Sequence, residues 1–203
     1  HGDNSGLVLP PRIAPIQAVV IPVAQHKPGV LDHAATLLAR LQAAGIRARM
    51  DDSEQSMGWK AAEYEMKGIP LRVEIGPKDM EKNQCVLVRR DSGEKVFISL
   101  DELETAVPAT LDAIHDGLYQ RAKKNLEDHI FAAHSLEEAK ALQAQHGGFI
   151  KTMWCGDEAC EIKMKEEGGM TSRCVPFAQE HLGDTCPICG RAAKKMIYWG
   201  VAY

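Results

Sequence analysis

Apolar residues follow two different periods along the first quarter of the chain. Residues 16–23, IQAVVIPV, form a short apolar run rich in β-branched side chains, which is typical of a strand covered on both faces. Residues 30–45 repeat apolar positions at helical spacing and end at a glycine, which predicts a helix. Residues 46–50 alternate as a second strand. This order predicts a right-handed crossover over a mostly parallel sheet.

Residues 56–79, SMGWKAAEYEMKGIPLRVEIGPKD, carry the signals of a helix, a tight turn and a strand. Ser53 or Ser56 could cap the helix, and Gly68 is placed to end it, because glycine enters the left-handed region without a Cβ clash. Residues 71–75 alternate apolar and charged side chains, which is the period of a half-buried strand.

The next segment predicts an antiparallel edge to this sheet. Apolar runs at 84–90 and 96–100 flank the turn sequence Asp-Ser-Gly, so they read as a hairpin. A long helical region follows, and Pro108 is best placed in the first turn of a second helical segment that runs to about residue 130. The expected sheet is therefore mixed, with about five strands and flanking helices, and the long helix links it to a second domain.

The last third predicts a smaller α/β domain. Ser135-Leu136-Glu137-Glu138 is a capping-box pattern for a helix that ends at Gly147-Gly148. Candidate strands follow at 149–154, 171–177 and 196–203. We therefore expect an α/β fold with a lead-in at 1–15, a first domain at 16–107 and a second at 108–203.

Composition narrows the class of protein. The 203 residues carry a net charge of −4 with 45% hydrophobic residues, which is enough for packed cores and excludes a global polycationic attraction to nucleic acid. Any contact with nucleic acid must be local. Neither a bilayer-spanning run nor a secretory signal is visible, so a soluble, intracellular protein without membrane contact is expected. The sequence begins with His1, which suggests a trimmed chain.

Cysteine spacing predicts a metal site. A C-x4-C pair and a C-x2-C pair, about 25 residues apart, suit a tetrahedral ion, because two thiolates on one tight turn can bind it and a second turn completes the set. Four thiolates leave no open position for water, so the predicted ion is a structural zinc. Cys174 is a possible substitute ligand, although it is expected to pack as a small hydrophobic residue, as is Cys85. The predicted ligands are Cys155, Cys160, Cys186 and Cys189.

An aromatic, an acidic and a basic residue recur four apart at Trp59, Glu63 and Lys67, so they share one face of the predicted helix. The ring can stack on a nucleobase, and Glu63 can accept from a guanine edge. The alternative is an ordinary surface ion pair with Trp59 partly buried. Catalytic signals are weak, since the sequence has no nucleophile motif, Walker loop or G-x-G-x-x-G.

Three stretches follow one another along the chain: HGDNSGLVLPPRIAPIQAVVIPV, WKAAEYEMKGIPLRVEIGPKD and CVLVRRDSGEK. Together with the cysteine pairs and the closing Tyr203, they resemble the C-terminal part of prolyl-tRNA synthetases. The matching form occurs in eukaryotes, archaea and some bacteria. The resemblance covers essentially the whole chain. It implies that residues 1–15 are the last strand and the exit of a class II catalytic domain, that 16–107 form an anticodon-binding domain, and that 108–203 form a zinc-containing extension.

The resemblance also implies roles by position. Trp59 and Glu63 match helix positions that face the guanines of a proline anticodon, and the carboxylate of Tyr203 would reach toward the active site. Only residues 1–3 would remain of the amino-acid pocket. The other residues implied on the base-reading and backbone-holding surface are Lys67, Arg72, Lys78 and Asp79.

For the parent protein, the resemblance implies a cytoplasmic proline–tRNA ligase that uses ATP and Mg²⁺ in a catalytic domain mostly outside this chain. The partner would be tRNA(Pro), and the chain alone should not form prolyl-adenylate. The family dimerises mainly through the catalytic domain, so the parent protein is expected to be a homodimer. This chain, which lacks most of that domain, could be a monomer in solution.

Two other classes of protein remain as alternatives. One is a free-standing zinc-bearing RNA-binding or regulatory module without ligase activity, against which the lead-in at 1–15 argues. The other is a doubly wound enzyme that binds a nucleotide at the strand ends, which the absence of a glycine-rich phosphate loop disfavours.

Overall fold

The computed structural model describes residues 1–202 and divides into two compact units, His1–Gln120 and Arg121–Tyr203. Each unit has a hydrophobic core of its own. The proposed role of Tyr203 lies outside the described residues. Within residues 1–202, every helix is too short or too polar to cross a lipid bilayer.

The first unit is built on a mixed five-stranded sheet with the order β4-β3-β5-β6-β7. The first three strands in this order are parallel, and the β5–β6 and β6–β7 pairs are antiparallel, so both the expected mixed sheet and the expected hairpin at its edge are confirmed. The bounds are β3 Ala18–Pro22, β4 Ala48–Met50, β5 Leu71–Ile75, β6 Gln84–Arg89 and β7 Lys95–Ser99.

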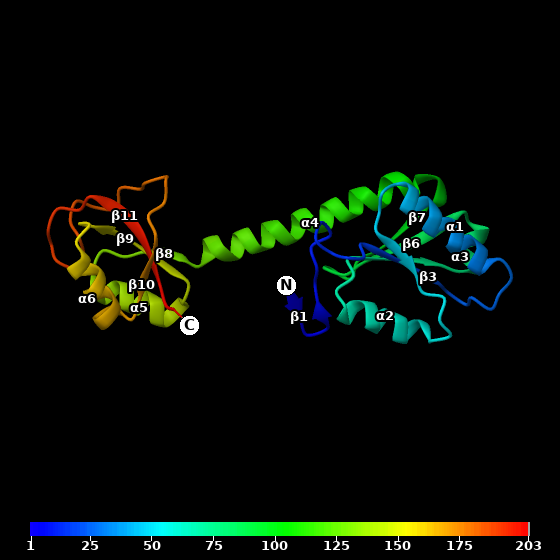
Figure 1. Ribbon diagram of the computed structural model, residues 1–203, viewed down its shortest axis with the longest axis horizontal. Coiled ribbons are helices and arrows are strands. Elements are labelled where there is room, and N and C mark those ends of the chain that lie inside the picture. The colour runs from blue at the N-terminus through cyan, green and yellow to red at the C-terminus, as the bar shows by residue number, and fades with distance from the viewer. Residues whose placement is uncertain (203) are drawn as a thin grey trace. The chain divides into compact units, whose positions relative to one another are not determined.

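Helices cover both faces of this sheet (Figure 1). Helix α1 (Val30–Ala43) and the beginning of α4 (Leu103–Asp128) pack on the face that buries Ala18 and Val20. Helix α2 (Met57–Met66) lies on the opposite face, where Val19 and Ile21 point. Because successive residues of a strand point to opposite faces, the continuous apolar run of β3 supplies both layers.

Strand β5 differs from its sequence prediction because it is buried on both faces rather than half-buried. It lies between β3 and β6, so its charged side chains also face packed layers. Arg72 is only 7% exposed. The short helix α3 (Pro77–Glu81) directly after β5 was also not predicted.

Helix α4 corrects a second prediction, because Pro108 lies inside one continuous helix and starts no new segment. A 3₁₀ turn (Leu100–Glu102) precedes the helix, with Ser99 accepting a hydrogen bond at its start. The compact units divide at Gln120, inside α4, because the earlier residues of this helix belong to the first core. The buried residues of α4 are Leu103, Val107, Leu111, Ile114 and Leu118.

The first residues form a two-stranded hairpin, whereas the residue pattern indicated a loop or an extended lead-in and the resemblance implied a single last strand. Strands β1 (Gly2–Asp3) and β2 (Gly6–Leu7) pair with each other, and each has only two residues, too few to show a period. The Arg90 guanidinium donates hydrogen bonds to both carboxylate oxygens of Asp3, at 2.7 and 2.8 Å. It also donates to the backbone carbonyl of Glu65, near the end of α2. The hairpin is thus fastened to the C-terminal end of α2.

Two glycines at helix ends allow a matched test of this packing. Gly45 and Gly68 follow α1 and α2 with φ of +80° and +70°. A Cβ at Gly68 would lie 2.6 Å from Leu7 Cβ, whereas one at Gly45 would meet none of the described atoms within 4 Å. We expect Gly45→Ala to cost about 1 kcal/mol of unfolding free energy, from the left-handed backbone alone. Gly68→Ala should cost about 2 to 4 kcal/mol, because overlap with the hairpin adds to that strain.

Hydrogen exchange of the β3 and β5 amides in the two variants would measure both costs. Equal destabilisation would contradict the close approach of Leu7 to Gly68.

The second unit contains a four-stranded sheet with the order β10-β11-β9-β8. Helices α5 and α6 pack along it, and the core is centred on Trp199, whose Nε1 donates to Thr152 Oγ1 at 2.9 Å. Ser135 caps α5 as predicted, while strand β8 and helix α6 were missed. The bounds are β8 Ile130–Ala132, α5 Leu136–His146, β9 Phe149–Trp154, α6 Glu158–Gly168, β10 Thr171–Cys174 and β11 Lys195–Gly200.

Candidate metal centre and nucleic-acid interface

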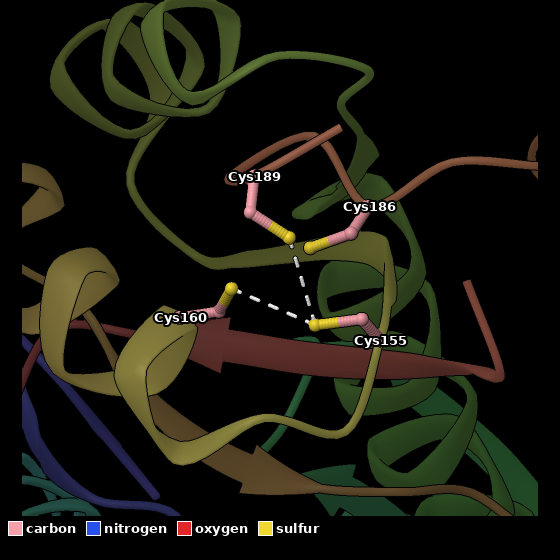
Figure 2. A group of neighbouring side chains, drawn as sticks. All are labelled: Cys155, Cys160, Cys186 and Cys189. Carbon is pink, nitrogen blue, oxygen red and sulfur yellow. Dashed lines mark hydrogen bonds between the residues drawn. The ribbon is translucent and has the colours of Figure 1, made fainter. Parts of the chain in front are cut away.

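The four predicted ligands converge at one point of the second unit. Figure 2 shows their side chains pointing toward one another. Cys155 directly follows β9, Cys160 lies in the first turn of α6, and Cys186 and Cys189 share a tight turn near the chain end. The prediction of two ligands on one turn therefore holds for the second pair, whereas the first pair uses a strand end and a helix.

The sulfur geometry fits a tetrahedral ion. All four Sγ atoms lie within 4.8 Å of one another. Cys155 Sγ is 3.6 Å from Cys160 Sγ and 3.7 Å from Cys189 Sγ, and none of the described cysteines forms a disulfide. Four sulfurs about 2.3 Å from one zinc ion would lie about 3.8 Å apart at tetrahedral angles. The four cysteines could therefore hold a metal ion without large movement.

Backbone hydrogen bonds shape the second ligand pair. Cys186 N donates to Arg191 O at 2.8 Å, and Gly190 N donates to Cys186 O at 2.8 Å. Gly190 has φ of +74° and Gly156, next to Cys155, has φ of +84°. Glycine adopts this left-handed conformation at little cost, so each ligand pair has a residue that lets the chain turn beside it.

Arg191 is a neighbour of the cysteine site that sequence reasoning missed. Its guanidinium donates to Cys189 Sγ at 3.3 Å and is anchored by Asp157, the N-cap residue of α6, at 2.5 Å. The hydrogen bond from Arg191 lowers the pKa of Cys189 to about 6, whereas burial raises the pKa of Cys160. A bound cation would favour the thiolate at every ligand. The signal in the sequence was an arginine two residues beyond a cysteine pair.

The other two cysteines lie outside this cluster. Cys85 is fully buried in the first core, as predicted. Cys174 is exposed, so the prediction that it packs as a small hydrophobic residue is wrong. Its strand β10 has a register shift between Ser172 and Cys174 at its end, where the pairing with β11 stops. A side chain at such a strand end need not face the core.

Helix α2 exposes the two ends of the predicted aromatic and charged stripe, Trp59 and Lys67, whereas the Glu63 side chain between them is half-buried at 21% exposure. Ser56 caps the helix by accepting from Trp59 N at 3.2 Å. Trp59 is 47% exposed, so its ring is partly buried, as the alternative of an ordinary surface ion pair also expects, and part of it remains accessible. Glu63 and Lys67 form the expected ion pair at 2.6 Å. The stripe therefore offers an accessible ring beside a carboxylate and an ammonium group.

The remaining predicted contacts differ in accessibility. Lys78 is exposed on α3. Arg72 is held at 2.7 Å by Glu65 and at 3.1 Å by Glu74, with its side chain only 8% exposed. Asp79 accepts from Gly76 N at 3.0 Å and from Gln84 at 3.2 Å, so it caps its own helix. Arg72 and Asp79 are thus occupied by partners other than the stripe.

Comparisons with known proteins match both units. Residues 17–110 match the family model described as anticodon binding domain, and residues 136–203 match the one described as prolyl-tRNA synthetase, C-terminal. The chain is 58% identical to a proline–tRNA ligase of Clostridium botulinum (strain Okra / Type B1) and 55% identical to that of Clostridium novyi (strain NT). It is 54% identical to proline–tRNA ligase 2 of a Bacillus cereus strain. Each alignment covers 100% of this chain and 42% of the relative.

Proposed function

The chain belongs to the prolyl-tRNA synthetase family, whose C-terminal part it matches, and we propose that it recognises the anticodon of a proline tRNA. The stripe of Trp59, Glu63 and Lys67, whose tryptophan and lysine are exposed, carries this proposal. RNA sequence is read mostly in single-stranded loops, where splayed bases stack on aromatic rings and pair along their edges. With a net charge of −4 on the chain, recognition must come from this local surface.

The activity that we propose for the whole protein is attachment of proline to tRNA(Pro). Relatives named as proline–tRNA ligases, aligned over the full length of this chain, favour this activity over a free-standing regulatory module. ATP and Mg²⁺ would be used by the remaining part of such a ligase, since the chain spans 42% of the relatives' length. The location that we propose is the cytoplasm, where tRNA charging supplies protein synthesis.

We further propose that Cys155, Cys160, Cys186 and Cys189 bind a structural zinc ion. Softness and geometry support zinc, because four thiolates at tetrahedral spacing select it over oxygen-seeking cations. Four thiolates and one Zn²⁺ carry two net negative charges, which the guanidinium of Arg191 would partly balance. When bound, the ion would cross-link β9, α6 and the turn near the chain end.

A binding comparison tests the anticodon assignment. The chain is titrated with a proline tRNA and with a variant in which both anticodon guanines are replaced, at one fixed moderate salt concentration. We expect the variant to bind at least about tenfold more weakly, which corresponds to 1.4 kcal/mol. Equal, salt-sensitive binding of both RNAs would mean phosphate attraction only, and would overturn anticodon recognition by α2.

A further inference from the structure

Lys60, next to Trp59 on α2, is the only buried residue of this helix and is 2% exposed. The helix otherwise meets the sheet through partly buried Met57 and Tyr64. Few apolar contacts therefore hold α2 in place, and a buried ammonium group lies among them.

The partners of Lys60 come from two loops. Its Nζ donates to Asp51 O at 2.8 Å and to Gln25 Oε1 at 3.3 Å, and it lies 3.6 Å from Asp51 Oδ1. Gln25 Nε2 in turn donates to the carbonyls of Asp52 at 2.9 Å and Ser53 at 3.0 Å. We call Lys60, Gln25 and Asp51 the Lys60 network. It joins the loop after β3, the loop after β4 and the first turn of α2.

Stability alone is a weak reason for a lysine at this position. Taking an ammonium group out of water costs several kcal/mol, and apolar residues of similar volume often replace buried ion pairs without loss. The directional bonds to Asp51 and Gln25 instead define one arrangement of the two loops. Ala24, just before Gln25, has φ of +55°, a conformation that costs a non-glycine residue about 1 to 2 kcal/mol. The backbone preference of Ala24 therefore does not determine the conformation of this loop.

The space beside the network is open. A pocket of about 230 Å³ is lined by Lys60 and by residues of both loops. Side chains do not fill this side of the network, so the loops could move into the space if the hydrogen bonds were lost. In the first turn of α2, the bonds of Lys60 tie the helix to both loops that border this space.

We propose that Lys60 is a positioning residue of the anticodon interface: its network fixes the first turn of α2 and thereby the ring of Trp59. This inference rests on the proposed anticodon recognition. Lys60 itself is too buried to meet RNA, so it acts through the orientation of Trp59.

Fluorine NMR of the whole chain labelled with 5-fluorotryptophan provides the test. The chain has three tryptophans, Trp59, Trp154 and Trp199, and the signal lost in Trp59→Phe identifies the first. In Lys60→Met we expect the Trp59 signal to shift or broaden while the other two stay unchanged. Discrimination between the proline tRNA and its guanine-replaced variant should fall about tenfold. Lys95→Met, which removes an exposed lysine from edge strand β7, serves as the control.

Gln25→Ala is the second variant, in case Lys60→Met does not fold. It removes the bonds to Asp52 and Ser53 and should change the Trp59 signal and the discrimination in the same direction, to a smaller extent. A lower melting temperature with an unchanged Trp59 signal and unchanged discrimination would overturn the positioning role. If the unmodified chain does not discriminate, the anticodon proposal fails, and the fluorine signal still decides whether the network orients Trp59.

Discussion

Removing the proposed metal ion from the four-cysteine site is expected to open the second unit while the sheet of the first unit stays folded. The apparent free energy of zinc binding at structural sites is about 10 to 16 kcal/mol, which is comparable to the whole stability of a typical domain, about 5 to 15 kcal/mol. The ligands span Cys155 to Cys189, so their release frees β9, α6 and the terminal turn from one another. A chelator titration followed by hydrogen exchange would measure protection in residues 149–202 and in the sheet before residue 101.

Cysteine variants provide the matched comparison. Cys155→Ser removes a proposed ligand and should reproduce the effect of the chelator. Cys174→Ser changes an exposed cysteine of the same unit that lies outside the cluster, and should leave protection intact. If chelation melts both units together, or if the two variants behave alike, the proposed structural role of the ion is wrong.

Replacing Trp59 by alanine is expected to weaken binding of a proline tRNA about 5- to 150-fold, because stacking of one base on an aromatic side chain contributes about 1 to 3 kcal/mol. The ring is 47% exposed, so part of it is accessible to a base. Equilibrium titrations at constant salt would measure the loss. Binding within twofold of the unmodified chain would exclude Trp59 as a stacking platform.

Two further variants separate base reading from phosphate attraction. Glu63→Ala should reduce the preference for guanine, because in the proposed complex the carboxylate would accept hydrogen bonds from the guanine edge. Lys78→Ala should weaken the matched and guanine-replaced RNAs uniformly and should lower the salt dependence of binding. If Glu63→Ala lowers the affinity for both RNAs equally, the assignment of Glu63 to a guanine is wrong.

Much of the first unit follows from the spacing of apolar residues. The segment that became α1 has a clear helical period, and β3 and the β6–β7 hairpin are marked by short apolar runs, so local pattern and final fold agree. Strand order was not predictable to the same extent, because pairing depends on contacts between distant segments. The burial of β5 was hidden for a related reason: Arg72 and Glu74 look exposed in the sequence, but Arg72 is buried with its guanidinium paired to both Glu65 and Glu74.

Helix α6 shows where pattern fails. Its sequence EACEIKMKEEG has no apolar stripe, since only Cys160 and Met164 are buried and Ile162 is exposed. In the sequence, the segment that forms α6 is signalled by the C-x4-C spacing rather than by a hydrophobic face. Strands β1, β2 and β8 have two or three residues each, which is too short for a period to appear.

In the candidate sites, too, sequence spacing predicted some residues and missed others. Cysteine spacing was enough to group the four ligands, and helical spacing was enough to pair Glu63 with Lys67. Arg191 could not be assigned, because its anchor, Asp157, lies 34 residues earlier in the chain. Recognition of guanine by the stripe stays a prediction that the RNA titrations must decide.

The division of the chain inside α4 also has a consequence for its synthesis on the ribosome. Leu118 is the last residue of the first core, so every residue of that core is translated before Cys155, the first proposed zinc ligand. Because domains generally fold as units and N-terminal ones first, the first unit can fold without waiting for metal. A shortage of zinc during translation would then yield chains with a finished first unit and an open second unit, which proteases would remove.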